Sequence, residues 1–211
     1  VIGGSQWLGD FKDYYAIVPD KYLNDSELAD STDLVKQIAQ WNGETKLFSI
    51  DADRHYLKYR TDVYAQPAAQ QAYMDEFNAE LAVPTTWAEY NRQAAFFGGL
   101  SASGAWTPTG QPDGVDFYGS VVVMARDNLM FSAFISRVAP YAKHHDVKGG
   151  FWFDENMVPQ VNNPGFVQGL EDFVEAVGFV PPGYSSTGLA EEIGSFGKGE
   201  AMFSYTWDDA Y

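Results

Sequence analysis

The chain has 211 residues, 45% of them apolar and 16% aromatic, which suffices for a sizeable core in one large domain or two smaller ones and excludes disorder. Its formal net charge of -16 repels nucleic-acid phosphates and anionic lipid, so nucleic acid is excluded as a partner, and the same charge suits an exported protein kept in solution. The lack of cysteine excludes disulfides, thiolate nucleophiles and cysteine zinc sites.

The first half of the chain is predicted to form three helices and two strands. The helices cover residues 31–41, 67–79 and 86–99, and the strands cover residues 46–50 and 56–60. Asn42-Gly43 supplies the stop of the first helix, and Pro67 suits the first turn of the second. Thr86 and Glu89 form a capping box, in which each side chain satisfies a free backbone donor of the first turn.

The second half is predicted to add a loop, two strands, an aromatic hairpin and three helices. The loop covers residues 101–114, the strands 117–123 and 201–207, the hairpin 151–156, and the helices 128–141, 163–177 and 189–196. Gly178 is the expected C-terminal cap of the second of these helices. Mixed strands and helices indicate an α/β or α+β fold.

Motifs of catalysis and metal binding are missing from the sequence. There is no Gly-x-Ser-x-Gly elbow, no His-Glu-x-x-His and no phosphate-binding loop with lysine. His144-His145-Asp146 does not predict a metal site, because adjacent side chains diverge on a helix or strand. The acidic pairs Glu191-Glu192 and Asp208-Asp209 are interpreted as solvated faces, since no EF-hand pattern surrounds them. We therefore expect no metal and no cofactor.

Several sequence words occur together in an order and spacing typical of one protein family. They are GSQWLG at residues 4–9, YLKYRTD at 56–62, VPTTWAEY at 83–90, VNNPGF at 161–166 leading into LEDF at 170–173, and PPG at 181–183 followed by FGKGEAM at 196–202 and by Trp207. Over most of its length the chain thereby resembles the family 1 solute-binding proteins of ABC sugar importers.

This resemblance implies an α/β, two-lobed periplasmic-binding-protein-like fold of type II, incomplete in this chain, which we expect to be an internal part of a longer one. It assigns residues 1–50 to part of the first lobe, 51–60 to the hinge crossing, 61–200 to the second lobe and 201–211 to the strand returning to the first lobe. It also implies a monomeric periplasmic or extracellular receptor that closes over a sugar in the interlobe cleft and delivers it to ABC permease subunits, with no chemistry of its own.

A sugar site needs aromatic faces that cover the C–H patches of the ring, together with planar polar groups that bond pairs of hydroxyls. The candidates lie in predicted loops, at the predicted hinge crossing or just past a strand end: Gln6, Trp7, Asp51, Asp53, His55, Trp106, Trp207 and Asp208. A core role for Trp207, a polar hairpin tip around Asp51 to His55 and a surface anchor at Trp106 are the alternatives. Trp41, Trp87 and Trp152 are assigned to packing.

Two rival functions remain open from the sequence. Asp51, Asp53, Asp208 and Asp209 would suit a cationic solute, such as a polyamine or a metal complex, as well as they suit a polyol. A glycoside hydrolase needs only two carboxylates set across a cleft, and any of the 29 acidic residues could serve. Turnover discriminates between these functions, because a binding protein releases its sugar intact.

Overall fold

The computed structural model describes residues 5–23, 30–49, 53–104, 106–111, 113–142 and 150–207. The chain divides into two compact units, Val1–Asp53 and Arg54–Tyr211, each with its own internal contacts. The division falls inside the segment predicted to be the hinge crossing. The assignment of the two units to two lobes of a receptor stays a prediction.

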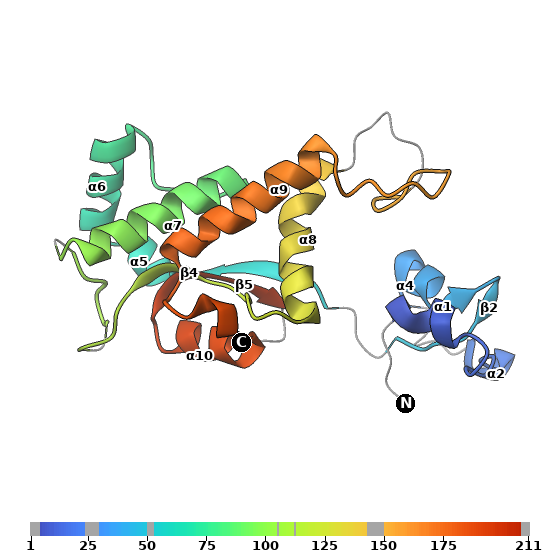
Figure 1. Ribbon diagram of the computed structural model, residues 1–211. Coiled ribbons are helices and arrows are strands. Elements are labelled where there is room, and N and C mark those ends of the chain that lie inside the picture. The colour runs from blue at the N-terminus through green and yellow to red at the C-terminus, as the bar shows by residue number, and fades with distance from the viewer. Residues whose placement is uncertain are drawn as a thin grey trace. The chain divides into compact units, whose positions relative to one another are not determined.

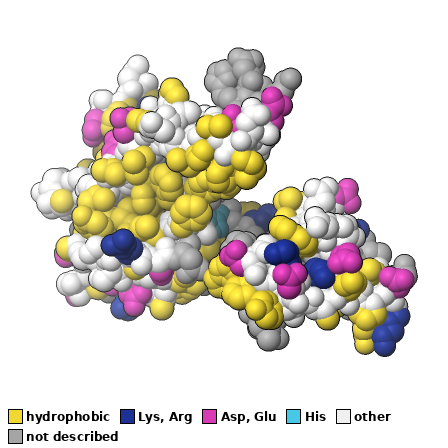
Figure 2. All heavy atoms as spheres, turned by 45° about the vertical axis from the view of Figure 1, so that its right-hand side comes forward, with side chains coloured by type: hydrophobic (Ala, Val, Ile, Leu, Met, Phe, Trp, Pro, Cys, Tyr) yellow, Lys and Arg dark blue, Asp and Glu magenta, His cyan; other side chains and the backbone are white. Residues whose placement is uncertain are grey.

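The first unit consists of short elements around a small core. Its elements are η1 (Ser5–Trp7), α1 (Leu8–Phe11), α2 (Asp20–Leu23), α4 (Asp33–Ile38), β1 (Gln40–Trp41) and β2 (Glu44–Thr45) (Figure 1). Among its described residues the buried apolar side chains are Leu8, Val18 and Ala39, whereas Tyr14 is 85% and Leu34 66% exposed. Much of the apolar surface of this unit is therefore exposed, as the hydrophobic side chains in Figure 2 show.

The first predicted helix is shorter than expected at its C-terminal end. Thr32 caps α4, which ends at Ile38, and Trp41 belongs to β1. Asn42 and Gly43 have φ angles of 50° and 81° and connect β1 to the antiparallel β2 in a two-residue turn. The interpretation of Asn42-Gly43 as a helix stop was wrong, because this pair tolerates the two positive φ angles that a tight hairpin requires.

The strand predicted over residues 46–50 is not formed in its described part. Residues 46–49 have no regular structure, and Ile50 lies outside the described residues. The backbone N–H groups of Lys46 and Leu47 donate to the carbonyl of Ala39 at 2.9 and 3.2 Å, so they bond a helix end rather than a neighbouring strand. Apolar composition alone could not distinguish these two uses of the backbone.

The second unit is organised around a three-stranded sheet. Its strands are β3 (His55–Tyr59), β4 (Tyr118–Val121) and β5 (Ala201–Trp207), in the order β3-β5-β4. The central strand β5 runs antiparallel to β3 and parallel to β4. Residues 201–206 are all buried because both faces of β5 are covered, which explains a sequence that is apolar without regular alternation.

Helices cover both faces of this sheet. They are α5 (Thr61–Tyr64), α6 (Pro67–Phe77), α7 (Trp87–Ala102), α8 (Asn128–Ala142), α9 (Pro164–Glu175) and α10 (Leu189–Gly197), with the 3-10 turns η2 (Ala176–Phe179) and η3 (Tyr184–Ser186). Figure 1 shows α7 and α9 on one side of the sheet and α10 on the other. The predicted mixed α/β class, the long helices and the final strand are confirmed.

Local capping signals locate the helix starts correctly. The backbone N–H of Glu89 donates to the Thr86 hydroxyl at 3.1 Å, and the Glu89 carboxylate accepts from the Thr86 N–H at 3.2 Å. Asn163 caps α9 by accepting from the N–H of Phe166 at 2.9 Å. The predicted cap at Gly178 was wrong, because α9 continues directly into η2 and Gly178 lies inside that turn.

The predicted hairpin at residues 151–156 is reduced to one bridge between Phe153 and Pro159. The predicted loop at residues 101–114 begins later than expected, since α7 continues to Ala102. The second difference is at an element boundary, where backbone bonding depends on neighbours distant in sequence.

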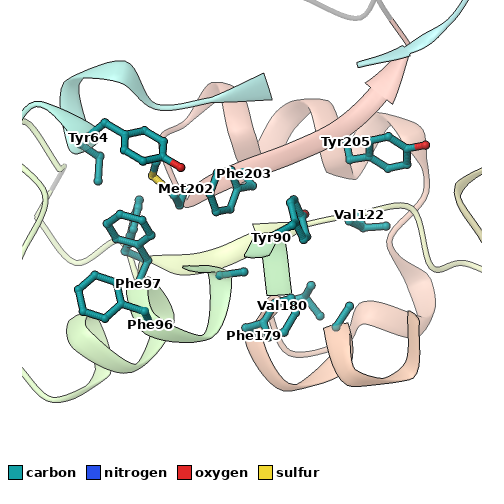
Figure 3. Close-up of a cluster of buried hydrophobic side chains, with 14 of the residues drawn as sticks. Tyr64, Tyr90, Phe96, Phe97, Val122, Phe179, Val180, Met202, Phe203 and Tyr205 are labelled. Carbon is teal, nitrogen blue, oxygen red and sulfur yellow. The ribbon is translucent and has the colours of Figure 1, made fainter. Parts of the chain in front are cut away.

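The main core of the second unit lies between α7 and the sheet. Figure 3 shows Tyr90 and Phe97 of α7 directed toward Phe203 of β5, with ring centroids 5.0 and 6.3 Å from it. Tyr205 occupies one edge of the same cluster, and its hydroxyl points away from the other labelled side chains (Figure 3). The core therefore presents a polar atom where β5 nears its end.

Candidate functional site

A cluster of aromatic and polar side chains lies where β3 begins and β5 ends. His55 is paired with Trp207 in the antiparallel register, and their ring centroids are 4.3 Å apart at an interplanar angle of 90°. The His55 ring also meets Tyr205 edge to face at 5.1 Å. His55 and Trp207 are both half-buried, so parts of both aromatic side chains are accessible to solvent.

The polar partners of His55 come from the sheet and from α8. Its Nδ1 lies 3.1 Å from the Tyr205 hydroxyl and 3.2 Å from the hydroxyl of Ser136. The Ser136 hydroxyl also donates to the carbonyl of Ser132, one turn earlier in α8, at 3.1 Å. Three elements thus fix the position of this imidazole.

The charge state of this cluster is set by burial and by one lysine. Desolvation, followed by the positive charge of Lys58, lowers the pKa of His55 below its ordinary value of 6.5, so the imidazole is neutral at neutral pH. The Lys58 ammonium itself donates to the backbone carbonyl of Trp207 and ties β3 to the end of β5. The cluster consequently combines a neutral imidazole with a nearby cation.

A buried arginine supports the cluster from the side of α8. Arg137 is fully buried, and its guanidinium lies 4.6 Å from the ring centroid of Trp87 and 4.9 Å from that of Tyr90. It donates to the Asn91 side-chain carbonyl at 2.7 Å. The Trp87 ring centroid lies 4.9 Å from that of Tyr205, so the Arg137 cation contacts a ring that itself packs against the cluster.

A buried carboxylate supports β5 from its opposite face. Glu192 of α10 is fully buried and accepts from the Ser204 hydroxyl at 2.8 Å and from the Tyr205 N–H at 3.2 Å. Burial raises its pKa to about 7, against the lowering effect of these hydrogen bonds. The interpretation of Glu191-Glu192 as a solvated face was therefore half wrong: Glu191 is exposed, but Glu192 points at the sheet.

Glu192 predicts an unusual pH dependence of stability. Its folded pKa of about 7 lies above the ordinary 4.5, so the folded state holds the proton more tightly and this stabilisation is lost as the pH rises through the folded value. The free energy of unfolding should fall by about 2 kcal/mol between about pH 5 and about pH 7 on account of this one group. Chemical denaturation across this range measures the slope.

The variant Glu192→Gln should remove that fall, because its amide oxygen can accept the same two bonds without titrating. The control is Glu171→Gln on α9, where the carboxylate is exposed. An unchanged pH slope in Glu192→Gln would contradict the assignment.

The other predicted site residues belong to the first unit, to the surroundings of Trp106 or to positions outside the described residues. Trp7 ends η1 in the first unit with 50% of its surface exposed, and Asp53 is exposed at the end of the same unit. The backbone of Gln6 belongs to η1, but its side chain is outside the description. Asp51 and Asp208 lie outside the described residues, as do the His144-His145-Asp146 run and Asp209.

Trp106 lies within the second unit but apart from the cluster at His55. Its indole N–H donates to the Gln66 side chain at 3.1 Å, and its ring lies 6.0 Å from Phe97 and 5.8 Å from Phe117. These contacts are with the hydrophobic core. The ligand role assigned to Trp106 stays a prediction.

The three tryptophans assigned to packing differ in their surroundings. Trp87 packs against the main core, and Trp152 stacks on Phe131 with centroids 5.3 Å apart. Trp41 remains 37% exposed in the first unit.

Ser136, Tyr205 and Lys58 were not selected by the sequence analysis. Ser136 lies within an amphipathic helix and Tyr205 within an apolar strand, so both positions read as ordinary packing. No sequence signal marks Lys58, because the alternation of β3 places residues 55 and 58 on opposite faces of the strand.

A separate cavity of about 400 Å³ lies within the first unit. The residues lining it are Leu23, Ser31, Val35, Lys36, Ala39, Gln40, Thr45, Leu47, Phe48 and Ser49. None of the predicted site residues lines this cavity. Across the described ranges, no group of three or more metal-ligating side chains is found.

Comparison with known proteins establishes the fold. No protein-family model matches the sequence, and no curated protein matches it either. Among solved structures, the chain is similar to maltose-bound MalE3 of T. maritima (18% identity, TM-score 0.69, 98% of this chain and 45% of the other). Two further similar structures are ABC transporter solute-binding proteins of Agrobacterium. One is from A. vitis S4 with bound D-mannitol (19%, TM-score 0.63, 98% and 43%), and the other is from A. radiobacter K84 with ribitol (22%, TM-score 0.62, 96% and 45%).

These similarities show that the chain has the mixed α/β fold of periplasmic binding proteins, as predicted. The chain spans less than half the length of each of these structures. No helix in the described part of the chain is long and apolar enough to cross a membrane.

Proposed function

We propose that this chain is part of the substrate-binding component of an ABC importer and that it binds a sugar or polyol. The observation that carries the proposal is the cluster of Trp207, His55 and Tyr205 at one end of the sheet, in a periplasmic-binding-protein fold. On this proposal the protein is a monomeric receptor, periplasmic or extracellular, which delivers its solute to membrane permease subunits and performs no reaction itself.

The chemistry of the cluster suits a neutral polyhydroxylated ligand. The half-buried indole of Trp207 offers an apolar surface for sugar C–H groups, while the imidazole of His55 offers directed hydrogen bonding. Sugars and polyols are bound by the similar structures with maltose, D-mannitol and ribitol, and this agreement supports the choice of solute class. We further propose that Trp7 and Trp106 contribute aromatic faces and that Gln6, Asp51, Asp53 and Asp208 contribute polar contacts.

A cationic solute is the alternative that one observation favours. The chain carries a formal charge of -16, and Asp53 is exposed next to the strand that holds His55. Lys58 opposes this alternative, because its ammonium lies at the same strand ends and would repel a second cation.

A thermal-shift screen tests the proposed function on the 211-residue chain. The panel contains maltose, D-mannitol, ribitol, spermidine, putrescine and divalent metal ions. A compound present at about 100 times its dissociation constant should stabilise the protein by about 2.7 kcal/mol, which raises the melting temperature measurably. A sugar or polyol that stabilises the chain and is recovered intact supports the receptor. Stabilisation by the polyamines or metal ions alone would mean that the receptor binds a cationic solute and not a sugar. Consumption of the sugar would indicate a glycosidase.

Trp207→Ala should weaken binding of the stabilising sugar by about 1 to 3 kcal/mol, because the face that covers the ring is lost. Isothermal titration calorimetry measures the change in affinity. Trp41→Ala, which removes a partly exposed indole from the first unit, is the control. Unchanged affinity together with a lower melting temperature in Trp207→Ala would assign Trp207 to the core instead.

A further inference from the structure

Two hydroxyl groups approach the same nitrogen of His55. The Tyr205 and Ser136 oxygens lie 3.1 and 3.2 Å from Nδ1, and they come from residues 150 and 81 positions away in the sequence. Among the described residues, no hydrogen bond to the second ring nitrogen, Nε2, is found. The His55 side chain is half-buried, so part of it is accessible to solvent.

The hydrogen-bonding capacity of Ser136 determines which nitrogen carries the proton. A hydroxyl has one donor hydrogen and two acceptor lone pairs. The Ser136 hydrogen is directed to the carbonyl of Ser132, which can only accept, at 3.1 Å. Its oxygen then faces Nδ1 with lone pairs, and a second lone pair on Nδ1 would repel it. The contact is favourable only when Nδ1 carries the hydrogen and donates.

The same arrangement satisfies Tyr205. With Nδ1–H shared between the two oxygens, the Tyr205 hydroxyl accepts with a lone pair and keeps its own hydrogen. A neutral imidazole with a hydrogen on Nδ1 has a lone pair on Nε2. The lowered pKa of His55 keeps this neutral form populated at neutral pH.

We propose that Ser136 and Tyr205 are positioning residues that hold His55 as the Nδ1–H tautomer, so that Nε2 accepts a hydrogen bond from a hydroxyl of the bound sugar or polyol. The inference rests on the proposed function and adds to it which partner donates in one hydrogen bond: the ligand hydroxyl donates and Nε2 accepts. A site whose polar group is an acceptor selects ligands with an O–H at that place and rejects analogues that lack one, because the acceptor would be left unpaired.

The tautomer is measured directly by long-range ¹H–¹⁵N correlation spectra of the ¹⁵N-labelled chain without ligand. The sequence contains three histidines, so His144→Gln and His145→Gln assign the signals. We expect the Nδ1–H pattern for His55 in the wild type. The double variant Ser136→Ala with Tyr205→Phe should shift His55 toward the Nε2–H tautomer, which an unconstrained histidine prefers. The single variant Ser136→Thr keeps a hydroxyl at this position and should show the same Nδ1–H pattern as the wild type.

Affinity for maltose, D-mannitol or ribitol, whichever stabilises the wild type, provides the second readout. Ser136→Ala and Tyr205→Phe should each weaken binding about 10-fold, the effect of one lost hydrogen bond. Tyr184→Phe is the control, because Tyr184 is 38% exposed in η3 and away from His55.

An Nε2–H tautomer in the wild type, or a tautomer that the double variant leaves unchanged, overturns the inference. So does a tautomer shift with unchanged affinity. If no sugar or polyol binds the wild type, the proposed function fails, and the spectra still decide whether Ser136 and Tyr205 position the ring.

Discussion

Gly119→Ala is expected to lower the free energy of unfolding by more than about 3 kcal/mol. Gly119 lies in β4, where a Cβ atom would come within 1.8 Å of the Ala94 carbonyl oxygen and 2.7 Å of the Ala94 Cα. Both are backbone atoms of α7, so relief requires the whole helix to move away from the sheet. That movement would open the core between α7 and β5, and denaturant unfolding followed by circular dichroism measures the loss.

The matched control for this substitution lies in α7, the helix that Gly119 approaches. Gly99→Ala adds the same methyl group to α7, where the Cβ atom would meet no other part of the protein within 4 Å, and an exposed helical alanine is more favourable than glycine by about 1 kcal/mol. Gly99→Ala should therefore be neutral or stabilising. A Gly119→Ala variant as stable as the wild type would show that α7 and β4 can separate at little cost.

Arg137→Ala is expected to destabilise the second unit by about 3 kcal/mol, since a fully buried side chain is replaced by a cavity. The substitution also removes the cation stacked on Trp87 and Tyr90 and the donor to Asn91. Thermal and denaturant unfolding measure the effect. Arg126→Ala, which removes an exposed guanidinium, should change stability by less than about 0.5 kcal/mol.

Arg137→Met separates the two contributions of the arginine. No ion pair of Arg137 is found among the described residues, and burial lowers its pKa because the charged form is desolvated. A methionine fills most of the volume and carries no desolvation cost, so Arg137→Met should lie within about 1.5 kcal/mol of the wild type. If Arg137→Met is as unstable as Arg137→Ala, the cation itself and not its volume holds Trp87 in place beneath Tyr205.

Both predictions concern how the site cluster is supported. Gly119 allows α7 to approach the sheet closely, and α7 carries Trp87 and Tyr90. Arg137 fills the space behind these rings, next to Ser136 in the same helix. Loss of either support should therefore also disturb the position of Tyr205, whose ring lies 4.9 Å from that of Trp87.

Local sequence signals were sufficient for most elements of the second unit. The capping box at Thr86, the Asn163 cap and Pro67 at the start of α6 locate helix starts without tertiary information, because each satisfies backbone groups within one turn. The last strand was predicted with its correct bounds, since a short apolar run rich in aromatic residues fits a strand covered on both faces. The α/β class follows from their alternation.

The sequence was less informative where a short segment is compatible with two different structures. The apolar run over residues 46–50 satisfies strand composition, but the carbonyl of Ala39 takes two of its backbone donors. Glu191-Glu192 reads as one polar pair, yet the helical turn of α10 places one carboxylate in solvent and the other against β5. A helix separates adjacent side chains by about 100° around its axis, and only packing decides which of them is buried.

The sequence by itself determined the long helices and the last strand of the second unit, the charge of the chain, and the choice of His55 and Trp207 as candidate site residues. Only the tertiary structure decided that these two rings meet, because they lie on the first residue of one strand and the last residue of its antiparallel neighbour. It also decided that Ser136 and Tyr205, two residues of ordinary packing pattern, contact the same imidazole nitrogen. Contacts between residues far apart in the chain depend on strand register and on how helices dock on the sheet. Both are set by the apolar side chains that the whole unit buries, which no local segment specifies alone.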